Sequence, residues 1–130
     1  KSCIENKKVI LIDDSIVRGT TANKIVKMVY EAGAKEVHLG ISCPPIKHPD
    51  FYGIDTPNYN ELIASQSDLN EMTKLVGAKS LFFLSLAGTY KAMGCDKRNP
   101  KTPQFTDHCF TGEYPIDVSE ILEINKKINE

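Results

Sequence analysis

The sequence has no tryptophan, no long apolar run and no excess of charge of either sign. Apolar runs such as residues 9–12 are far too short to cross a bilayer, and residues 1–8 have no hydrophobic signal-peptide core. The 16 basic and 17 acidic residues give a net charge of −1, which does not predict a patch for nucleic acid or an anionic membrane. We therefore expect a soluble, cytoplasmic chain with no nucleic-acid and no membrane partner.

Cysteine is scarce and widely spaced. There are four cysteines, and no two of them form a Cys-x-x-Cys pair; they are Cys3, Cys43, Cys95 and Cys109. Without a secretion signal or a high density of cysteine, a disulfide framework is not expected, and we predict reduced, partly buried thiols. The alternative is a metal or cluster site that combines two of them with His48 or His108, which the spacing does not favour.

The first part of the chain predicts a strand, a helix and a second strand. Residues 8–12 are almost wholly apolar, as in a strand buried on both faces of a parallel sheet. From about residue 20 the apolar positions follow helical spacing, and Gly33 is placed to end that helix. Residues 37–42 form the next apolar run, so the unit predicts a right-handed parallel crossover. The fold class is therefore α/β, a mostly parallel sheet with flanking helices.

The rest of the chain predicts shorter elements. We expect helices at residues 60–64, 68–76 and 87–93 and a third buried strand at residues 80–85. Ser67 is the predicted N-cap of the second of these helices. Residues 95–116 show no apolar periodicity and predict an irregular loop, in which Lys97, Arg98 and Lys101 form a basic patch expected to be solvated. Residues 117–130 predict a terminal helix that begins at a sequence resembling a capping box headed by Asp117.

The segment between the first strand and the first helix contains residues suited to a phosphate. In open α/β sheets, ligands bind outside the carboxyl ends of the strands, where this segment lies. Gly19 lets the backbone approach a ligand, and hydroxyls are available from Ser15, Thr20 and Thr21. The amides at the start of the following helix carry a partial positive charge. Together these groups predict a site for a phosphate monoester.

Two acidic residues precede that phosphate site. Asp13 and Asp14 would repel a phosphate, but carboxylates suit sugar hydroxyls or a hard cation such as Mg²⁺. A single sugar phosphate, with its hydroxyls several ångströms from its phosphate, would satisfy both halves of the segment. The alternative is an ordinary polar turn in which Asp14 or Ser15 caps the helix.

Residues 9–21 resemble the phosphoribosyl-pyrophosphate (PRPP) motif of type I phosphoribosyltransferases: a hydrophobic strand, two acids, then a loop rich in hydroxyls and glycine. The variant from Asp13 to Thr21 is similar to that of the amidophosphoribosyltransferases. Other segments look like the same family in the same order; they are residues 31–37, 42–46, 48–55, 61–64 and 109–115.

The resemblance implies a function and a set of site residues. Such an enzyme replaces the pyrophosphate of PRPP with ammonia cut from glutamine, giving 5-phosphoribosylamine in the first step of purine nucleotide synthesis. Asp13 and Asp14 would hold the ribose hydroxyls and Mg²⁺. The 5-phosphate would lie against the rest of the motif, namely Ser15, Val17, Arg18, Gly19, Thr20 and Thr21. The resemblance also implies homo-oligomers of the parent enzyme and feedback inhibition by purine nucleotides, and it identifies no catalytic residue in this chain.

Several parts of the family are missing from residues 1–130. The glutaminase half uses an N-terminal cysteine, and Cys3 does not match it because it follows two other residues directly before the PRPP strand. The early strands of the transferase domain, the flexible loop and the pyrophosphate loop are also not matched. We expect the C-terminal portion of a phosphoribosyltransferase domain, which would receive ammonia from a missing glutaminase half. The alternative is a non-catalytic remnant that binds ribose phosphates or nucleotides, or one subunit of a split enzyme.

Some members of the family carry a structural iron–sulfur cluster. The cysteines that would bind it correspond here to Asp50, Thr106 and Cys109, so only one of those three is a cysteine. We therefore expect no cluster and treat Cys109 as a packing thiol, with substitution by Cys43 or Cys95 as the less favoured alternative.

Two acids after a first strand also open the receiver domains of signalling proteins. Such a domain needs a phosphoacceptor aspartate after a later strand, and the third apolar run, at residues 80–85, ends without one. Of the remaining polar residues, His38 is expected to be a satisfied strand side chain. Tyr52 and Asp55 could line the site or belong to a packed loop.

Overall fold

The computed structural model describes residues 3–54, 56 and 58–128. Three parallel strands, β1 (Lys8–Asp13), β2 (Glu36–Ile41) and β3 (Ser80–Phe83), form a sheet in the order β1-β2-β3. The register aligns Asp13 with Ile41, and Ile41 with Phe83, so the three carboxyl ends meet at one edge of the sheet. This arrangement confirms the predicted α/β class with a parallel sheet.

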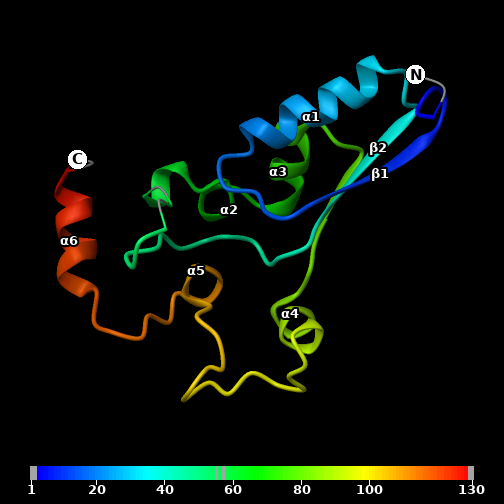
Figure 1. The fold of residues 1–130 in the computed structure, drawn as a ribbon. Helices are drawn as coiled ribbons and strands as arrows, with labels where there is room; N and C mark the ends of the chain where they lie inside the picture. The colour runs from blue at the N-terminus through cyan, green and yellow to red at the C-terminus, as the bar shows by residue number, and fades with distance from the viewer. Residues whose placement is uncertain (1–2, 55, 57, 129–130) are drawn as a thin grey trace.

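Helices cover one face of that sheet. α1 (Thr20–Glu31) connects β1 to β2, and α3 (Leu69–Val76) precedes β3. Figure 1 shows both helices on the same side of the strands. Shorter elements complete the described chain; they are η1 (Tyr59–Glu61), α2 (Ile63–Gln66), α4 (Leu86–Ala92), α5 (His108–Thr111) and α6 (Ser119–Ile128). No helix in the described ranges combines the length and the apolar character that crossing a membrane requires.

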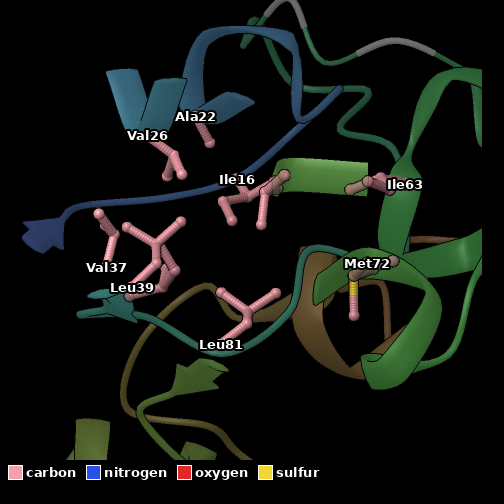
Figure 2. Packing of buried hydrophobic residues seen from close by; sticks show 11 residues of the cluster. Ile16, Ala22, Val26, Val37, Leu39, Ile63, Met72 and Leu81 are labelled. Carbon is pink, nitrogen blue, oxygen red and sulfur yellow. The ribbon is translucent and has the colours of Figure 1, made fainter. Parts of the chain in front are cut away.

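The hydrophobic core lies between the sheet and these helices. Val37, Leu39 and Leu81 project from the strands, and Val26 of α1 and Met72 of α3 pack over them (Figure 2). Two residues outside the main helices, Ile16 and Ile63, belong to the same buried cluster. The core therefore extends to the segment that joins β1 to α1, which is the predicted binding loop.

The other face of the sheet is exposed, contrary to the prediction that β1 is buried on both faces. Ile10 is 68% exposed, Ile12 is 63% exposed and Phe82 of β3 is 47% exposed. The cause is that the helices packed on the described strands lie on one face only. On the open face, a Cβ added to Gly40 would come within 2.5 Å of the ring of Phe82, so this glycine makes room for a large apolar side chain.

Several element boundaries differ from the predicted ones. The helix expected at residues 60–64 is divided into η1 and α2. The N-cap of α3 is Asp68, not Ser67: its carboxylate accepts the N–H of Glu71 at 2.8 Å, and the Glu71 side chain accepts the N–H of Asp68 at 2.9 Å. This capping box stabilises the helix start one residue later. β3 stops at Phe83 rather than at residue 85, because Ser85 caps α4 by accepting the N–H of Gly88 at 3.0 Å.

The C-terminal part is more ordered than predicted. The expected loop at 95–116 contains the short helix α5, which the sequence did not predict because four residues are too few for a periodic apolar pattern. The terminal helix is present as α6, and residues 129–130 of the prediction lie outside the described range. Asp117 accepts hydrogen bonds from the N–H and hydroxyl of Ser119, at 2.9 and 2.6 Å, rather than from Glu120 as a capping box requires.

Candidate functional site

The predicted binding residues surround one cavity at the carboxyl edge of the sheet. Asp13 is the last residue of β1, and Thr20 is the first residue of α1. The connection between them encloses a cavity of about 290 Å³ that is lined by residues 13–22. The structure therefore brings together all the residues predicted for PRPP; they are Asp13, Asp14, Ser15, Val17, Arg18, Gly19, Thr20 and Thr21.

The two carboxylates lie at the strand end of this cavity. Asp13 is half-buried and Asp14 is exposed. The N–H of Asp14 donates to Asp13 Oδ1 at 3.0 Å, and the hydroxyl of Ser15 donates to Asp14 Oδ1 at 3.1 Å. The backbone beneath them is fixed because the N–H and the hydroxyl of Ser42 both bind the carbonyl oxygen of Asp13, at 3.0 and 3.1 Å. In each carboxylate, Oδ1 accepts a hydrogen bond from the neighbouring residue.

The start of α1 forms the other end of the cavity. Gly19 is its N-cap and adopts a left-handed conformation with φ 78°. No side chain caps this helix, and its first turn has no acidic residue. The first amides of a helix have no intrahelical acceptor and carry partial positive charge, so an uncapped start is suited to an anion.

The side chain of Arg18 forms an ion pair with an acid, so it is not free to bind a phosphate. Its Nε donates to Glu61 Oε2 of η1 at 2.7 Å, and both side chains are about half exposed. Glu61 belongs to the segment 61–64 that resembles the family, but its contact with Arg18 was not predicted, because the two residues lie 43 positions apart.

Asp50, which stands where some family members have a cysteine of the iron–sulfur cluster, forms a buried polar pair. Asp50 Oδ1 accepts His108 Nε2 at 2.6 Å, and Asp50 Oδ2 accepts the N–H groups of Tyr52 and Ile54 at 2.9 and 2.8 Å. Burial alone would raise the pKa of Asp50, but these hydrogen bonds outweigh it, and the pKa lies below its usual value. Across the described ranges, no three His, Cys, Asp or Glu side chains are grouped so that they could hold a metal ion.

The cysteines near this pair are half-buried thiols. Burial raises the pKa of Cys43 to about 11, with smaller contributions from Cys109 and Asp14. Burial also raises the pKa of Cys109, and nearby Asp50 and Asp107 add to the effect. Cys95 is also half-buried, but Cys3 is exposed, so the predicted partial burial holds for three of the four thiols.

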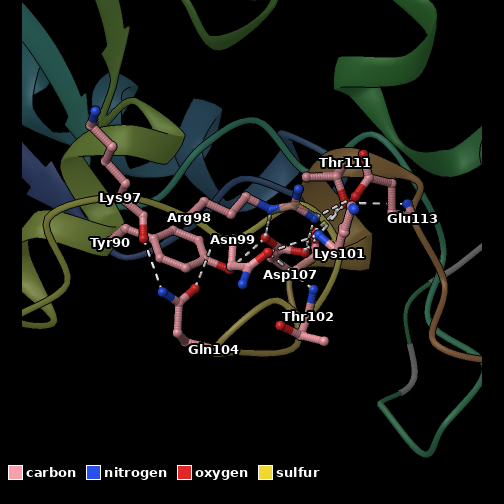
Figure 3. Close-up of polar contacts among 10 residues, drawn as sticks. All are labelled: Tyr90, Lys97, Arg98, Asn99, Lys101, Thr102, Gln104, Asp107, Thr111 and Glu113. Carbon is pink, nitrogen blue, oxygen red and sulfur yellow. Dashed lines mark hydrogen bonds and ion pairs between the residues drawn. The ribbon is translucent and has the colours of Figure 1, made fainter.

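The predicted basic patch at residues 97–101 is not simply solvated surface. Arg98 is only 15% exposed and forms two hydrogen bonds to Asp107, at 2.5 and 3.1 Å, and one to Glu113 at 2.6 Å (Figure 3). The hydroxyl of Tyr90 donates to the same Asp107 carboxylate at 2.7 Å. Burial opposes the charge of Asp107, but the contacts with Arg98 and Tyr90 lower its pKa. Lys97 and Lys101 are exposed as predicted, but the prediction is wrong for Arg98, because its acid is nine residues away in a segment without periodicity.

Two minor predictions concern side chains elsewhere. His38 is a satisfied strand residue, as expected: its Nδ1 lies 2.8 Å from Ser80 Oγ and its Nε2 lies 3.3 Å from Glu36. The ring of Tyr52 meets that of His108 edge-on at 5.0 Å, which places Tyr52 in the packed loop. Asp55 lies outside the described residues.

Comparison with known proteins identifies the family. No protein-family model matches the chain. Over 116 residues, the chain is 58% identical to an amidophosphoribosyltransferase of Rhizobium etli, which covers 88% of this chain and 23% of that protein. The chain belongs to the amidophosphoribosyltransferase family. The amidophosphoribosyltransferase of Bacillus subtilis is 48% identical over 118 residues, or 91% of this chain and 25% of that protein.

A solved structure confirms the fold. The glutamine PRPP amidotransferase from B. subtilis, in complex with ADP and GMP, superimposes with a TM-score of 0.80 and 49% identity. The match covers 90% of this chain and 26% of that one. The chain therefore has the fold of one segment of a type I phosphoribosyltransferase, and it spans about a quarter of the length of these amidophosphoribosyltransferases.

Proposed function

We propose that residues 13–21 bind the ribose 5-phosphate part of PRPP together with Mg²⁺, as the PRPP-binding segment of an amidophosphoribosyltransferase. That enzyme transfers ammonia derived from glutamine to PRPP and forms 5-phosphoribosylamine, the first step of purine nucleotide synthesis. One observation supports the proposal above all: two carboxylates and an uncapped helix start line the same cavity of about 290 Å³.

The carboxylates account for the sugar end of the ligand. Carboxylate oxygens accept hydrogen bonds, and the carboxylates of Asp13 and Asp14 would accept them from the 2- and 3-hydroxyls of ribose. Because Ser42 fixes the backbone of Asp13, the position of the sugar is set by the end of β1.

The phosphate end follows from the loop and the start of α1. The amides of residues 17–21 and the hydroxyls of Ser15, Thr20 and Thr21 would surround the 5-phosphate, which a helix N-terminus attracts. Gly19 allows the chain to turn into the helix with a positive φ that brings these amides to one side.

The residues present fit Mg²⁺ as an ion that accompanies its substrate. Mg²⁺ keeps several waters and is commonly held by one or two carboxylates plus substrate phosphates. Asp13 and Asp14 supply two hard oxygen donors of this type at the cavity rim. When bound, Mg²⁺ would neutralise charge on the pyrophosphate leaving group.

The chain's own residues assist the reaction by holding the sugar. Loss of pyrophosphate builds positive charge on the ribose ring, and fixed carboxylates beside the hydroxyls would stabilise that charge. A phosphate held at the start of α1 would keep the ring oriented while the bond breaks. We assign no catalytic acid or base to this chain.

The exposed face of the sheet supports a role as part of a longer protein. In the described chain β1 has a neighbouring strand on one side only, and Ile10 and Ile12 are largely exposed on the open face. We propose that the earlier strands of the transferase domain pair with the free edge of β1, and that other parts of that domain pack on the open face and cover these side chains. The glutaminase half, homo-oligomer contacts and the sites for purine nucleotides would belong to that longer polypeptide, which we place in the cytoplasm.

Ammonia-dependent release of pyrophosphate from PRPP tests whether the chain belongs to a working transferase. The chain is combined with the separately produced remainder of a relative, and pyrophosphate is measured with and without ammonium. Release that requires the chain, ammonium and PRPP supports the proposal. Saturable binding of PRPP without release would instead indicate a binding remnant.

A further inference from the structure

The binding loop is supported from behind by the segment η1–α2. The N–H of Ile63, the first residue of α2, donates to the carbonyl oxygen of Val17 at 3.0 Å. Ile63 is itself buried and belongs to the hydrophobic core together with Ile16, which precedes Val17 (Figure 2). The middle of the loop is therefore attached to the core by a backbone hydrogen bond, 46 residues away along the chain.

The side chain of Ile63 also fills the space behind Gly19. A Cβ added to Gly19 would lie 2.9 Å from Cδ1 of Ile63, closer than real Cβ contacts, and 3.9 Å from Val76. Gly19 has φ 78°, which a residue with a side chain rarely adopts. The orientation of the amides that follow Gly19 is thus set by a glycine resting directly on Ile63.

A third contact completes the support. Glu61 of η1 pairs with Arg18 at 2.7 Å. The segment from Glu61 to Ile63 consequently contacts three consecutive loop residues, Val17, Arg18 and Gly19, each in a different way. The pair of Glu61 and Arg18 is half exposed, so it contributes less than the buried contacts of Ile63.

We propose that Ile63, aided by Glu61, is a positioning residue for the phosphate end of the site. It touches no part of the ligand but fixes the directions of the amides of residues 19–21, and so it controls the affinity that depends on the phosphate. The inference rests on the proposed function of this loop. A binding site must be held to within about 0.5 Å of its productive geometry, so a small loss of support has a measurable effect.

The test is Ile63→Val, which deletes the Cδ1 atom that lies behind Gly19. Ribose 5-phosphate is titrated calorimetrically into this chain, and amide hydrogen exchange is followed at Ile63 and Asn23, whose N–H groups donate to the carbonyl oxygens of Val17 and Gly19. We expect an affinity about three- to ten-fold weaker and faster exchange at these amides. Glu61→Ala should weaken binding by only about two- to five-fold, and Glu61→Gln, which keeps an acceptor for Arg18, should restore most of it.

Val37→Ala is the matched control, because Val37 lies in the same buried cluster but at the far end of β2. It removes more apolar volume than Ile63→Val, yet it should leave ribose 5-phosphate affinity and loop exchange unchanged. Gly19→Ala should lose affinity, and Gly19→Ala combined with Ile63→Val should recover part of it, because the second change removes the clash.

Three results would overturn the proposal: wild-type affinity and exchange in Ile63→Val, an equal loss of affinity in Val37→Ala, or strictly additive losses in the double variant. If the wild-type chain binds no ribose 5-phosphate, the proposed function fails. Exchange at Ile63 and Asn23, which is measured without ligand, then still decides whether Ile63 positions the loop.

Discussion

Asp50 and His108 form a buried pair across 58 residues of sequence, with 2.6 Å between Oδ1 and Nε2. The next residue toward the N-terminus, Asp107, forms a second pair with Arg98. The carbonyl oxygen of Cys109 accepts the N–H groups of Lys47 and His48 at 2.9 and 3.1 Å. Consecutive residues at the start of α5 therefore bind two different parts of the chain: Asp107 contacts the segment that follows α4, and His108 and Cys109 contact the segment that follows β2.

Breaking the buried pair should destabilise the fold far more than breaking an exposed one. Asp50 and His108 side chains are 3% and 7% exposed. Asp50→Ala would leave His108 Nε2 and two backbone N–H groups without their acceptor, so we expect a loss of about 3–5 kcal/mol in the free energy of unfolding. Arg18→Gln, at the exposed pair with Glu61, should cost less than about 1 kcal/mol. Urea denaturation measures both, and similar losses in the two variants would contradict the account.

Acid should weaken the same region. The folded-state pKa values of Asp50 and Asp107 lie below their ordinary value of 3.8, so the unfolded chain binds protons more readily than the folded chain. Their contribution to stability is therefore present above pH 3.8 and is lost as the pH falls from there through their lower folded-state pKa values.

The midpoint of thermal unfolding, recorded from pH 7 down to pH 3, measures this effect. Asp107→Asn should be less stable at pH 7 and should lose less stability on acidification than the wild type. The pKa of His48 is also lowered, by burial and by Lys47. Its contribution to stability is therefore lost as the pH falls below 6.5, separately from that of the two aspartates. Parallel curves for the wild type and Asp107→Asn below pH 4.5 would rule out the assigned role of Asp107.

The half-buried thiols should react slowly. With its pKa raised to about 11, Cys43 is thiolate in only about one molecule in a thousand at pH 8. We expect iodoacetamide to modify the exposed Cys3 well before Cys43 or Cys109, as measured by peptide mass spectrometry over time. Equal rates at Cys3 and Cys43 in the folded protein would contradict the described burial.

The chain should contain no iron–sulfur cluster. Asp50 stands at one of the positions where a cluster would need a cysteine, and its carboxylate is already paired with His108. Protein produced with iron and sulfide supplied, and purified without oxygen, should contain no stoichiometric iron. Iron and sulfide in equal stoichiometric amounts would show that Cys43, Cys95 and Cys109 hold a cluster after all.

Local patterns predicted the strand–loop–helix unit because its signals are close together in the sequence. The apolar run that ends at Asp13, the helical spacing after Thr20 and the glycine between them are all local, and the structure has each of them in the expected place. The residues of this unit indicated only a sugar phosphate as the ligand, and the family resemblance narrowed that ligand to PRPP.

Long-range partners could not be predicted in the same way. Nothing in the sequence around Arg98 indicates that its acid is Asp107, and nothing around Gly19 indicates that Ile63 lies behind it. The apolar character of Ile10 and Ile12 was interpreted as burial on both faces. Hydrophobicity shows that a side chain is suited to burial, but the helices that are packed on the sheet decide which face is covered.

Titration of PRPP with Mg²⁺ into this chain tests the central claim most directly. The wild type should bind, and Asp13→Asn combined with Asp14→Asn should abolish binding while the circular dichroism spectrum stays unchanged, because both side chains lie at the cavity rim rather than in the core. Asp96→Asn, at an exposed acid outside the cavity, serves as the charge control and should bind like the wild type. Unchanged affinity in the double variant would contradict the assignment of Asp13 and Asp14 to PRPP.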